Sequence, residues 1–199
     1  MENEILSPLA FVTTVPTTDA SPKGTMCVKA IQDVSVPPSV VWAVLMNFDD
    51  YPKFISGLNA VKVYSKRRTV RGGQIVFAKY QLKISPFYQI EYFLEHHFEP
   101  LQNSMVWRLD YSRQSDVFDS VGYWNVEPMG SGSRVFYTQT SLLPAWIPGP
   151  VKKTFAKVAL RSATAQLEPA CLKYVQQQQA RSSFKPWERL KAMRERLES

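Results

Sequence analysis

The chain has 199 residues, of which 45% are hydrophobic and 13% aromatic, and its net charge is +7. This length fits one domain with extensions, and the hydrophobic content excludes a globally disordered chain. The positive charge permits binding to nucleic acid or to anionic membranes without requiring it, and the longest apolar run, residues 40–46, is too short to span a bilayer.

The N-terminal segment and the cysteines bear on location. Residues 1–25 are rich in Thr, Ser and Pro and lack periodicity, so we expect a flexible arm. The arm carries Glu2 and Glu4, has no apolar core of a secretory signal, and has none of the Arg of a typical transit peptide. Cys27 and Cys171 stand alone in the sequence, which is typical of reduced thiols, with one disulfide left open. We expect an intracellular protein and leave open a mitochondrion or chloroplast.

A strand and two short helices are predicted next. Residues 26–36 alternate apolar and polar side chains, as a strand does. Pro37 and Pro38 end this strand, and Pro38 suits the first turn of a helix, where its missing N–H costs nothing. The apolar run that follows predicts one short helix, and residues 51–56 predict a second that Gly57 ends.

Six further strands follow, at residues 61–66, 74–84, 87–98, 104–111, 115–126 and 134–142. The turns between them are short, which predicts an antiparallel meander.

A long helical pattern covers residues 151–181 and is long enough to cover the buried face of the sheet. Pro169 lies inside this pattern, so we expect a bend or break near residues 166–169. The middle of one helix face has small side chains, which fits either room for a cavity or close packing on the sheet. That face comprises Val151, Phe155, Val158, Ser162, Ala165, Pro169 and Leu172.

Alternation along the strands predicts which side chains face the interior. The inward set is unusually aromatic and carries several phenol hydroxyls. A ligand pocket has this composition, whereas a solid core is dominated by Leu, Ile and Val. Packing of the aromatic rings against the long helix is the alternative. The inward set is Val76, Ala78, Tyr80, Leu82, Tyr88, Ile90, Tyr92, Leu94, His96, Phe98, Met105, Trp107, Leu109, Tyr111, Phe118, Ser120, Gly122, Trp124 and Val126.

Catalytic chemistry finds little support in the sequence. His96 faces inward and His97 outward in this register, and general acid–base catalysis would need a carboxylate or second base near His96. Asp119 is expected to point outward, so His96 is more simply explained as a core histidine. The sequence lacks a defensible Ser–His–Asp order, a glycine-rich phosphate loop and a metal-ligand cluster. We therefore expect no catalytic residue, no metal and no cofactor.

Four motifs carry a resemblance to a known family: "VPPSVVWAVLMNFDDYPKFISGLNAV", "GYWNVEP", "GSRVFYTQT" and "IPGPVKKTFAKVALRSATAQL". In this order they resemble the START-like (SRPBCC) helix-grip superfamily, closest to its coenzyme Q-binding and polyketide cyclase/dehydrase branch, over roughly residues 26–178. The resemblance implies an α+β helix-grip fold. Its curved antiparallel sheet has about seven strands, with two short helices that Trp42 anchors at one end and a long C-terminal helix over an apolar cavity.

The implied division of the chain is a flexible arm at 1–25, a START-like ligand-binding domain at 26–181 and a charged amphipathic helix at 182–199. In the last segment, Trp187, Leu190, Met193 and Leu197 form an apolar stripe beside five cationic side chains. Such a helix docks either on its own domain or on an anionic membrane.

Pattern and resemblance together predict non-catalytic binding or transport of an apolar lipid-like ligand, such as a quinone or isoprenoid. The alternatives are a polyketide cyclase/dehydrase-like enzyme, in which His96 or a tyrosine moves a proton, and a membrane-associated interaction module. The expected partner is a hydrophobic small molecule or lipid, with peripheral membrane contact left open and no nucleic acid. The expected ligand-binding residues are Tyr80, Tyr92, Leu94, His96, Trp107, Leu109, Trp124, Trp146, Phe155 and Val158.

The loop at residues 143–150, "LPAWIPGP", joins the last strand to the long helix. We expect Trp146 and Ile147 to be exposed there and the loop to form the entrance to the cavity. The alternative is that its prolines only stiffen the connection.

Overall fold

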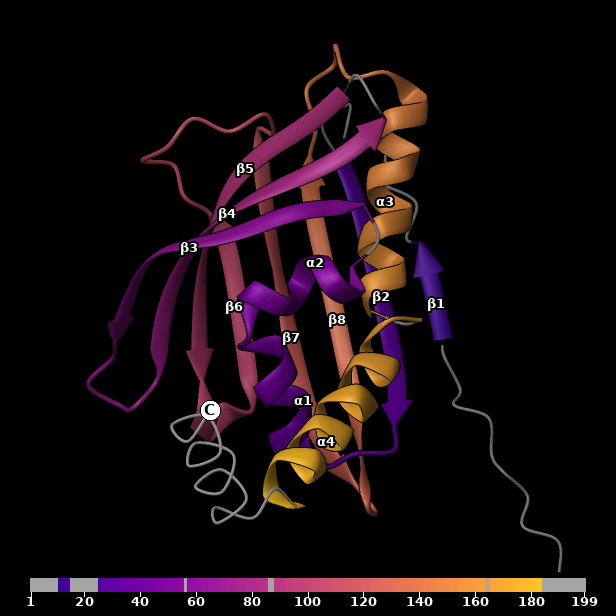
Figure 1. The fold of residues 1–199 in the computed structure, drawn as a ribbon. Helices are drawn as coiled ribbons and strands as arrows, with labels where there is room; N and C mark the ends of the chain where they lie inside the picture. The colour runs from indigo at the N-terminus through magenta and orange to yellow at the C-terminus, as the bar shows by residue number, and fades with distance from the viewer. Residues whose placement is uncertain (1–10, 15–24, 56, 86–87, 164, 184–199) are drawn as a thin grey trace, which may run out of the picture.

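The computed structural model describes residues 11–14, 25–55, 57–85, 88–163 and 165–183. Its strands are β1 (Phe11–Thr14), β2 (Thr25–Val34), β3 (Leu58–Arg68), β4 (Gln74–Ser85), β5 (Tyr88–Glu99), β6 (Ser104–Leu109), β7 (Asp119–Met129) and β8 (Gly132–Leu142). They form one curved antiparallel sheet in the order β1-β2-β8-β7-β6-β5-β4-β3 (Figure 1). The seven predicted strands and the meander from β3 to β8 are confirmed, and so is the α+β helix-grip fold.

The sequence does not predict β1. It lies inside the segment expected to be a flexible arm, and it extends the sheet by pairing with β2, with Phe11 opposite Ile31 and Thr14 opposite Val28. Four residues are too few to show a clear alternation among the surrounding Thr, Ser and Pro. The remainder of the expected arm, and the expected C-terminal helix from residue 184 onward, lie outside the described residues.

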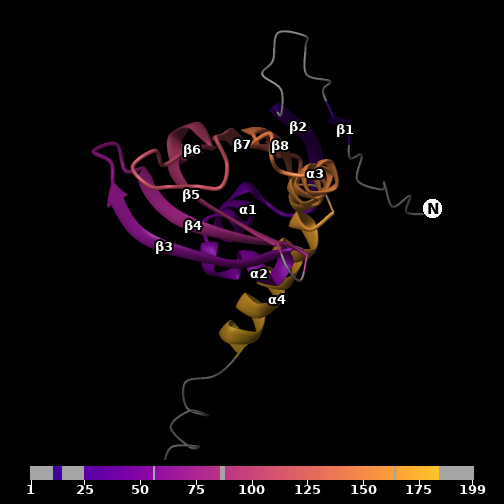
Figure 2. The same cartoon turned by 90° about the horizontal axis from the view of Figure 1, so that it is seen from above.

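Two short helices close one end of the sheet, as expected. They are α1 (Pro38–Leu45) and α2 (Tyr51–Phe54), separated by the 3₁₀ turn η1 (Phe48–Asp50), and both lie on the concave side of the sheet (Figure 2). Pro38 occupies the first turn of α1. Trp42 is buried and its ring centroid lies 4.8 Å from that of Phe98, so it ties α1 to β5 as the resemblance implies.

The long C-terminal helix is broken, as Pro169 predicts. It consists of α3 (Gly149–Ala163) and α4 (Leu167–Ser183), and Pro169 lies in the first turn of α4, where its missing N–H leaves no hydrogen bond unmade. α3 lies along β2, whereas α4 turns away and packs against α1 (Figure 1). Only α3 therefore acts as the gripping helix over the sheet.

The break also changes which residues α4 buries. Leu167 and Cys171 are buried, whereas Pro169 and Leu172 are exposed. The expectation of one continuous face from Val151 to Leu172 is therefore wrong beyond α3, because a new helix starts a new helical register. The start of α4 is fixed by Glu168, whose Oε1 accepts hydrogen bonds from the backbone N–H and the hydroxyl of Ser35, at 3.1 and 2.7 Å.

The connection from β6 to β7 is longer than predicted. Tyr111 and Phe118, expected to face inward, are 68% and 60% exposed because they lie beyond the strand ends. The connection takes over the role of a strand beside the far half of β5. The Ser115 hydroxyl accepts a hydrogen bond from the Phe93 N–H at 3.1 Å, and the Asp116 carboxylate accepts one from the Glu91 N–H at 2.8 Å. These contacts satisfy the edge of β5 where β6 has ended.

β3 forms the other edge of the sheet, and it is strongly basic. Lys62, Lys66, Arg67 and Arg68 are exposed along it. Its pairing with β4 shifts register twice, between Leu58 and Ala60 and between Val63 and Ser65. No helix among the described residues is both long and apolar enough to cross a membrane.

Candidate functional site

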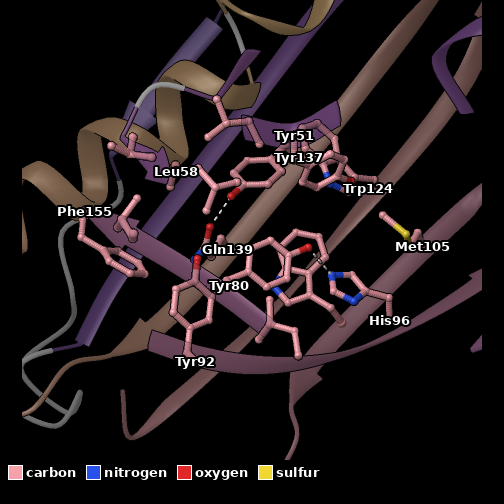
Figure 3. A pocket seen from close by; sticks show the side chains of 16 residues that line it. Tyr51, Leu58, Tyr80, Tyr92, His96, Met105, Trp124, Tyr137, Gln139 and Phe155 are labelled. Carbon is pink, nitrogen blue, oxygen red and sulfur yellow. Dashed lines mark hydrogen bonds between the residues drawn. The ribbon is translucent and has the colours of Figure 1, made fainter. Parts of the chain in front are cut away.

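A cavity of about 90 Å³ lies between the concave face of the sheet, the α2 region and α3 (Figure 3). Each strand from β3 to β8 contributes at least one of its sixteen lining side chains, and α3 covers it with Phe155, Val158 and Ala159. The register of the antiparallel strands puts alternate side chains of each strand on this face.

Eight of the ten predicted ligand-binding residues line the cavity. They are Tyr80, Tyr92, Leu94, His96, Trp107, Trp124, Phe155 and Val158. Leu109 is buried on the same face but does not reach the cavity, because it ends β6.

Trp146 is the second exception. It is 63% exposed, and its ring packs edge-on against Tyr88, with 6.4 Å between ring centroids, instead of lining the cavity. Ile147, expected to be exposed beside it, is buried, as is Leu143. The loop is thus anchored by two aliphatic side chains that point inward, and this arrangement turns Trp146 outward.

The predicted list of ligand-binding residues omits eight lining residues: Tyr51, Ile55, Leu58, Leu82, Met105, Tyr137, Gln139 and Ala159. On β8, Val135, Tyr137, Gln139 and Ser141 alternate along the strand and are all buried. Two of these four side chains are polar, so composition alone does not mark the buried face of β8. The pairing of Tyr137 with Trp124 on β7 shows which face of β8 is buried.

Aromatic rings make up much of the wall of the cavity. Tyr80 and Tyr92 stack with 5.3 Å between ring centroids, and Tyr137 lies between Trp107 and Trp124, at 5.7 and 4.4 Å. Such contacts fix the rings in place in addition to burying them.

Gly122 makes room for one of these rings. It faces Trp107 across the β6–β7 pair. A Cβ atom at this glycine would lie 2.2 Å from Cζ2 of the indole and 2.3 Å from the carbonyl oxygen of Thr138. Glycine is therefore required for the indole to lie against β7.

His96 and Tyr80 form the most buried polar pair at the cavity. The Tyr80 hydroxyl lies 3.1 Å from His96 Nε2 (Figure 3). On the other side of the ring, His96 Nδ1 lies 3.3 Å from the carbonyl oxygen of Val76. Since a carbonyl only accepts, Nδ1 carries the proton and Nε2 accepts from Tyr80. Burial lowers the pKa of His96 from 6.5 to about 4, so its imidazole is neutral at pH 7.

The other polar groups of the cavity are also neutral. The Tyr137 hydroxyl donates to Gln139 Oε1, and the Gln139 amide donates to the hydroxyl of Ser141 at 3.0 Å. Burial raises the pKa of Tyr80, Tyr92 and Tyr137 well above the usual value, so the phenols stay protonated. The Tyr92 hydroxyl has no hydrogen-bond partner among the described residues, which leaves it available to a ligand.

No charged side chain appears among the sixteen that line the cavity. Within the part of the chain that the structure describes, no group of three or more His, Cys, Asp or Glu side chains could hold a metal ion. The arrangement can enclose an apolar group and exchange hydrogen bonds with a neutral oxygen. It offers no counter-ion for a charged one.

Solved structures with the same fold include three of particular interest. An aromatase/cyclase, Zhui, from Streptomyces sp. R1128 is 14% identical, with a TM-score of 0.58 over 75% of this chain and 92% of that one. A START superfamily protein from Mycobacterium smegmatis is 16% identical, with a TM-score of 0.54 over 76% and 97%. A STAR-related lipid transfer protein from Xanthomonas axonopodis is 12% identical, with a TM-score of 0.52 over 80% and 98%. At these identities the likeness shows the fold alone.

The sequence itself matches a family. No curated protein matches the chain significantly. The model of the family described as "Polyketide cyclase / dehydrase and lipid transport" matches residues 34–168, about two thirds of the chain, from the end of β2 to the start of α4. The matched segment contains all sixteen cavity-lining residues and the first of the four motifs that carry the resemblance. The chain therefore belongs to the polyketide cyclase/dehydrase and lipid transport family, with the START-like helix-grip fold.

Proposed function

We propose that this chain binds or carries a neutral, mainly apolar ligand of the lipid, quinone or isoprenoid class without altering it. The observation that supports this most is the chemistry of the cavity wall, which is aromatic and aliphatic with neutral hydrogen-bonding groups only. A ligand with a carbonyl or hydroxyl oxygen could bond to the Tyr92 hydroxyl, which no described residue engages, while its apolar body contacts the rings.

The size of the cavity sets a condition on this function. At about 90 Å³ it is smaller than a ligand pocket of roughly 300–1,000 Å³. A lipid-sized ligand therefore has to displace part of the wall.

The backbone just before β3 approaches α3 closely at the wall of the cavity. A Cβ atom at Gly57 would lie 3.3 Å from Val158 Cγ2, and Leu58 and Val158 both line the cavity. Separation of Gly57 and Leu58 from α3 would widen the cavity without breaking a strand pair, because α3 is not a strand of the sheet. We propose this as the route by which the ligand enters.

A second function has a specific observation in its favour. The Tyr80–His96 hydrogen bond could pass a proton to or from a bound substrate, as a cyclase or dehydrase requires. Against it, the described cavity wall contains no carboxylate that could act as a partner for His96.

Two assays, one of ligand capture and one of substrate turnover, distinguish the two functions. The protein is incubated with a total lipid extract, re-isolated, and its bound molecules are identified by mass spectrometry. Trp107→Ala should lose most of the captured lipid, whereas Val106→Ala, a neighbour exposed on the opposite face, should retain it. Equal capture by wild type and Trp107→Ala would exclude the cavity as the binding site. Conversion of an added poly-β-ketone that is lost in Tyr80→Phe and His96→Asn would favour the enzyme.

A further inference from the structure

The gripping helix α3 is cationic and carries no acidic side chain. From Leu143 to Gln166 the sequence contains Lys152, Lys153, Lys157 and Arg161 and no Asp or Glu. Lys153, Lys157 and Arg161 are exposed and follow each other at steps of four, so they share one face of the helix. None of the three forms an ion pair with any residue that the structure describes.

An exposed indole stands at the N-terminal end of this helix. Trp146 is 63% exposed, while its neighbour Ile147 is buried and holds the loop in place. An indole has an apolar ring and one N–H donor, and such side chains are enriched at the boundary between membrane and water. We call Lys153, Lys157 and Arg161 the α3 face, and Trp146 lies in the loop that leads into this helix.

The opposite side of the same helix covers the cavity. Phe155 and Ala159 are buried and line it, two positions after Lys153 and Lys157 respectively. Figure 2 shows α3 end-on at the border of the concave side, with the sheet curving away from it. A surface bound to the α3 face would therefore be separated from the cavity by one helix.

We propose that the α3 face docks on an anionic lipid bilayer. Three cations without acidic neighbours complement an anionic headgroup layer, and Trp146 can enter the boundary beside them. The biological purpose rests on the proposed function, because a carrier of an apolar ligand has to exchange it where such ligands dissolve. The docking itself does not depend on ligand binding and can be tested without it.

A second basic surface helps to define the test. The β3–β4 hairpin carries Lys66, Arg67, Arg68 and Arg71, all exposed, and Arg67 lies over the Phe77 ring at 4.8 Å. The hairpin has similar charge but no exposed aromatic side chain among its described residues, and its cations lie on β3 and the turn after it, not on α3. Attraction by charge alone would act on both surfaces equally.

The experiment measures sedimentation of the full chain with vesicles of phosphatidylcholine, with and without about a third phosphatidylglycerol. Wild type should bind the anionic vesicles, bind the neutral ones weakly, and be released in about 0.5 M salt, where charges are screened within a few Å. The triple variant K153E/K157E/R161E should bind the anionic vesicles at least about tenfold more weakly than wild type. The matched variant K66E/R68E/R71E makes the same change in net charge and should bind nearly as wild type. Trp146→Ala should weaken binding while keeping its salt dependence.

Three results would overturn the proposal. The two triple variants could lose vesicle binding equally, or K153E/K157E/R161E could keep full vesicle binding. The α3 face could also bind single-stranded RNA as tightly as it binds the anionic vesicles. Thermal unfolding of each variant checks that it is folded. Binding of a neutral naphthalene dye without vesicles tests the cavity separately, and K153E/K157E/R161E should bind this dye as wild type does. If wild type does not bind the dye, the proposed function is refuted, whereas the docking result still stands.

Discussion

Tyr80 donates a hydrogen bond to His96 across the β4–β5 pair, and both side chains are buried. The imidazole is enclosed by the rings of Phe48 and Trp107, with centroids 4.8 and 6.3 Å away. A histidine in this setting has its full hydrogen-bonding capacity used while it remains uncharged.

The enclosure of His96 predicts a pH dependence of stability. The unfolded chain takes up a proton at this imidazole as the pH falls through about 6.5, whereas the folded protein does so only near pH 4. Between these values the unfolded state binds more protons, so the contribution of His96 is fully present above pH 6.5 and is lost progressively towards pH 4. By pH 5 we expect a loss of about 2 kcal/mol in the free energy of unfolding.

Urea unfolding of wild type and His96→Asn at pH 7.5 and pH 5 isolates this effect from that of the carboxylates, which both proteins share. The variant should be less stable at pH 7.5, and its stability should fall less between the two pH values. A parallel decline in both proteins would show that His96 is not the group responsible.

Removal of the Tyr80 hydroxyl tests the hydrogen bond itself. Tyr80→Phe leaves His96 Nε2 buried without a donor, and we expect a loss of about 1–3 kcal/mol in the free energy of unfolding. Tyr92→Phe is the matched control, since the Tyr92 hydroxyl bonds to none of the described residues, and it should cost much less. Similar losses in both variants would contradict the assigned hydrogen bond.

Gly122→Ala should displace the Trp107 indole. The new methyl group would overlap Cζ2 of Trp107, and overpacking of this kind costs about 1–3 kcal/mol. Near-ultraviolet circular dichroism should change along with the stability measured in urea. In the double variant with Trp107→Ala, the cost of the Gly122 change should fall without disappearing, because the Thr138 carbonyl oxygen is also too close. Simple additivity of the two changes would show that they do not interact.

Ala159→Leu should fill the cavity. Ala159 lies on α3 and lines the cavity, so a larger aliphatic side chain takes the space that a ligand would occupy. Dye or lipid binding should decrease at least tenfold, while stability changes by about 1–3 kcal/mol at most. Ala156→Leu, on a half-buried position of the same helix outside the cavity lining, serves as the control. Undiminished binding in Ala159→Leu would place the ligand elsewhere.

The two cysteines should differ in reactivity. Both are free thiols, so the disulfide left open by the sequence is not formed. Cys171 is fully buried, and burial together with the nearby Glu168 charge raises the pKa of its thiol to about 12. Ellman's reagent should therefore leave Cys171 unmodified in the native protein and react with it in denaturant. Rapid native labelling of a Cys27→Ser variant would contradict this burial.

Much of the cavity was predictable because one-sided burial of an antiparallel sheet imposes a period of two on the sequence. Tyr92, Leu94 and His96 follow this period on β5 and all line the cavity. The rule fails where a strand stops. Tyr111 continues the alternation of β6 in the sequence, but the backbone has already turned at Asp110, which accepts hydrogen bonds from Tyr64 and Ser112.

Other features depend on contacts between distant segments. Tyr137 and Gln139 belong to the cavity because β8 lies beside β7, and their mixed polarity does not reveal it. The volume of the cavity is the space left after rings from five strands and two helical segments have packed together, and no local pattern encodes such a remainder. The family resemblance implies that a cavity exists, whereas its small size follows only from the packing of the rings.

The basic edge strand β3 has a consequence for self-association. An open sheet exposes unpaired N–H and C=O groups at its border, where another chain could add a strand and start aggregation. A strand arriving at β3 would have to strip water from Lys62, Lys66, Arg67 and Arg68 and follow an edge whose register shifts twice. Two approaching copies would also repel each other through these charges. The positive charges of β3 thus oppose the addition of a strand from another copy of the chain at this edge of the sheet.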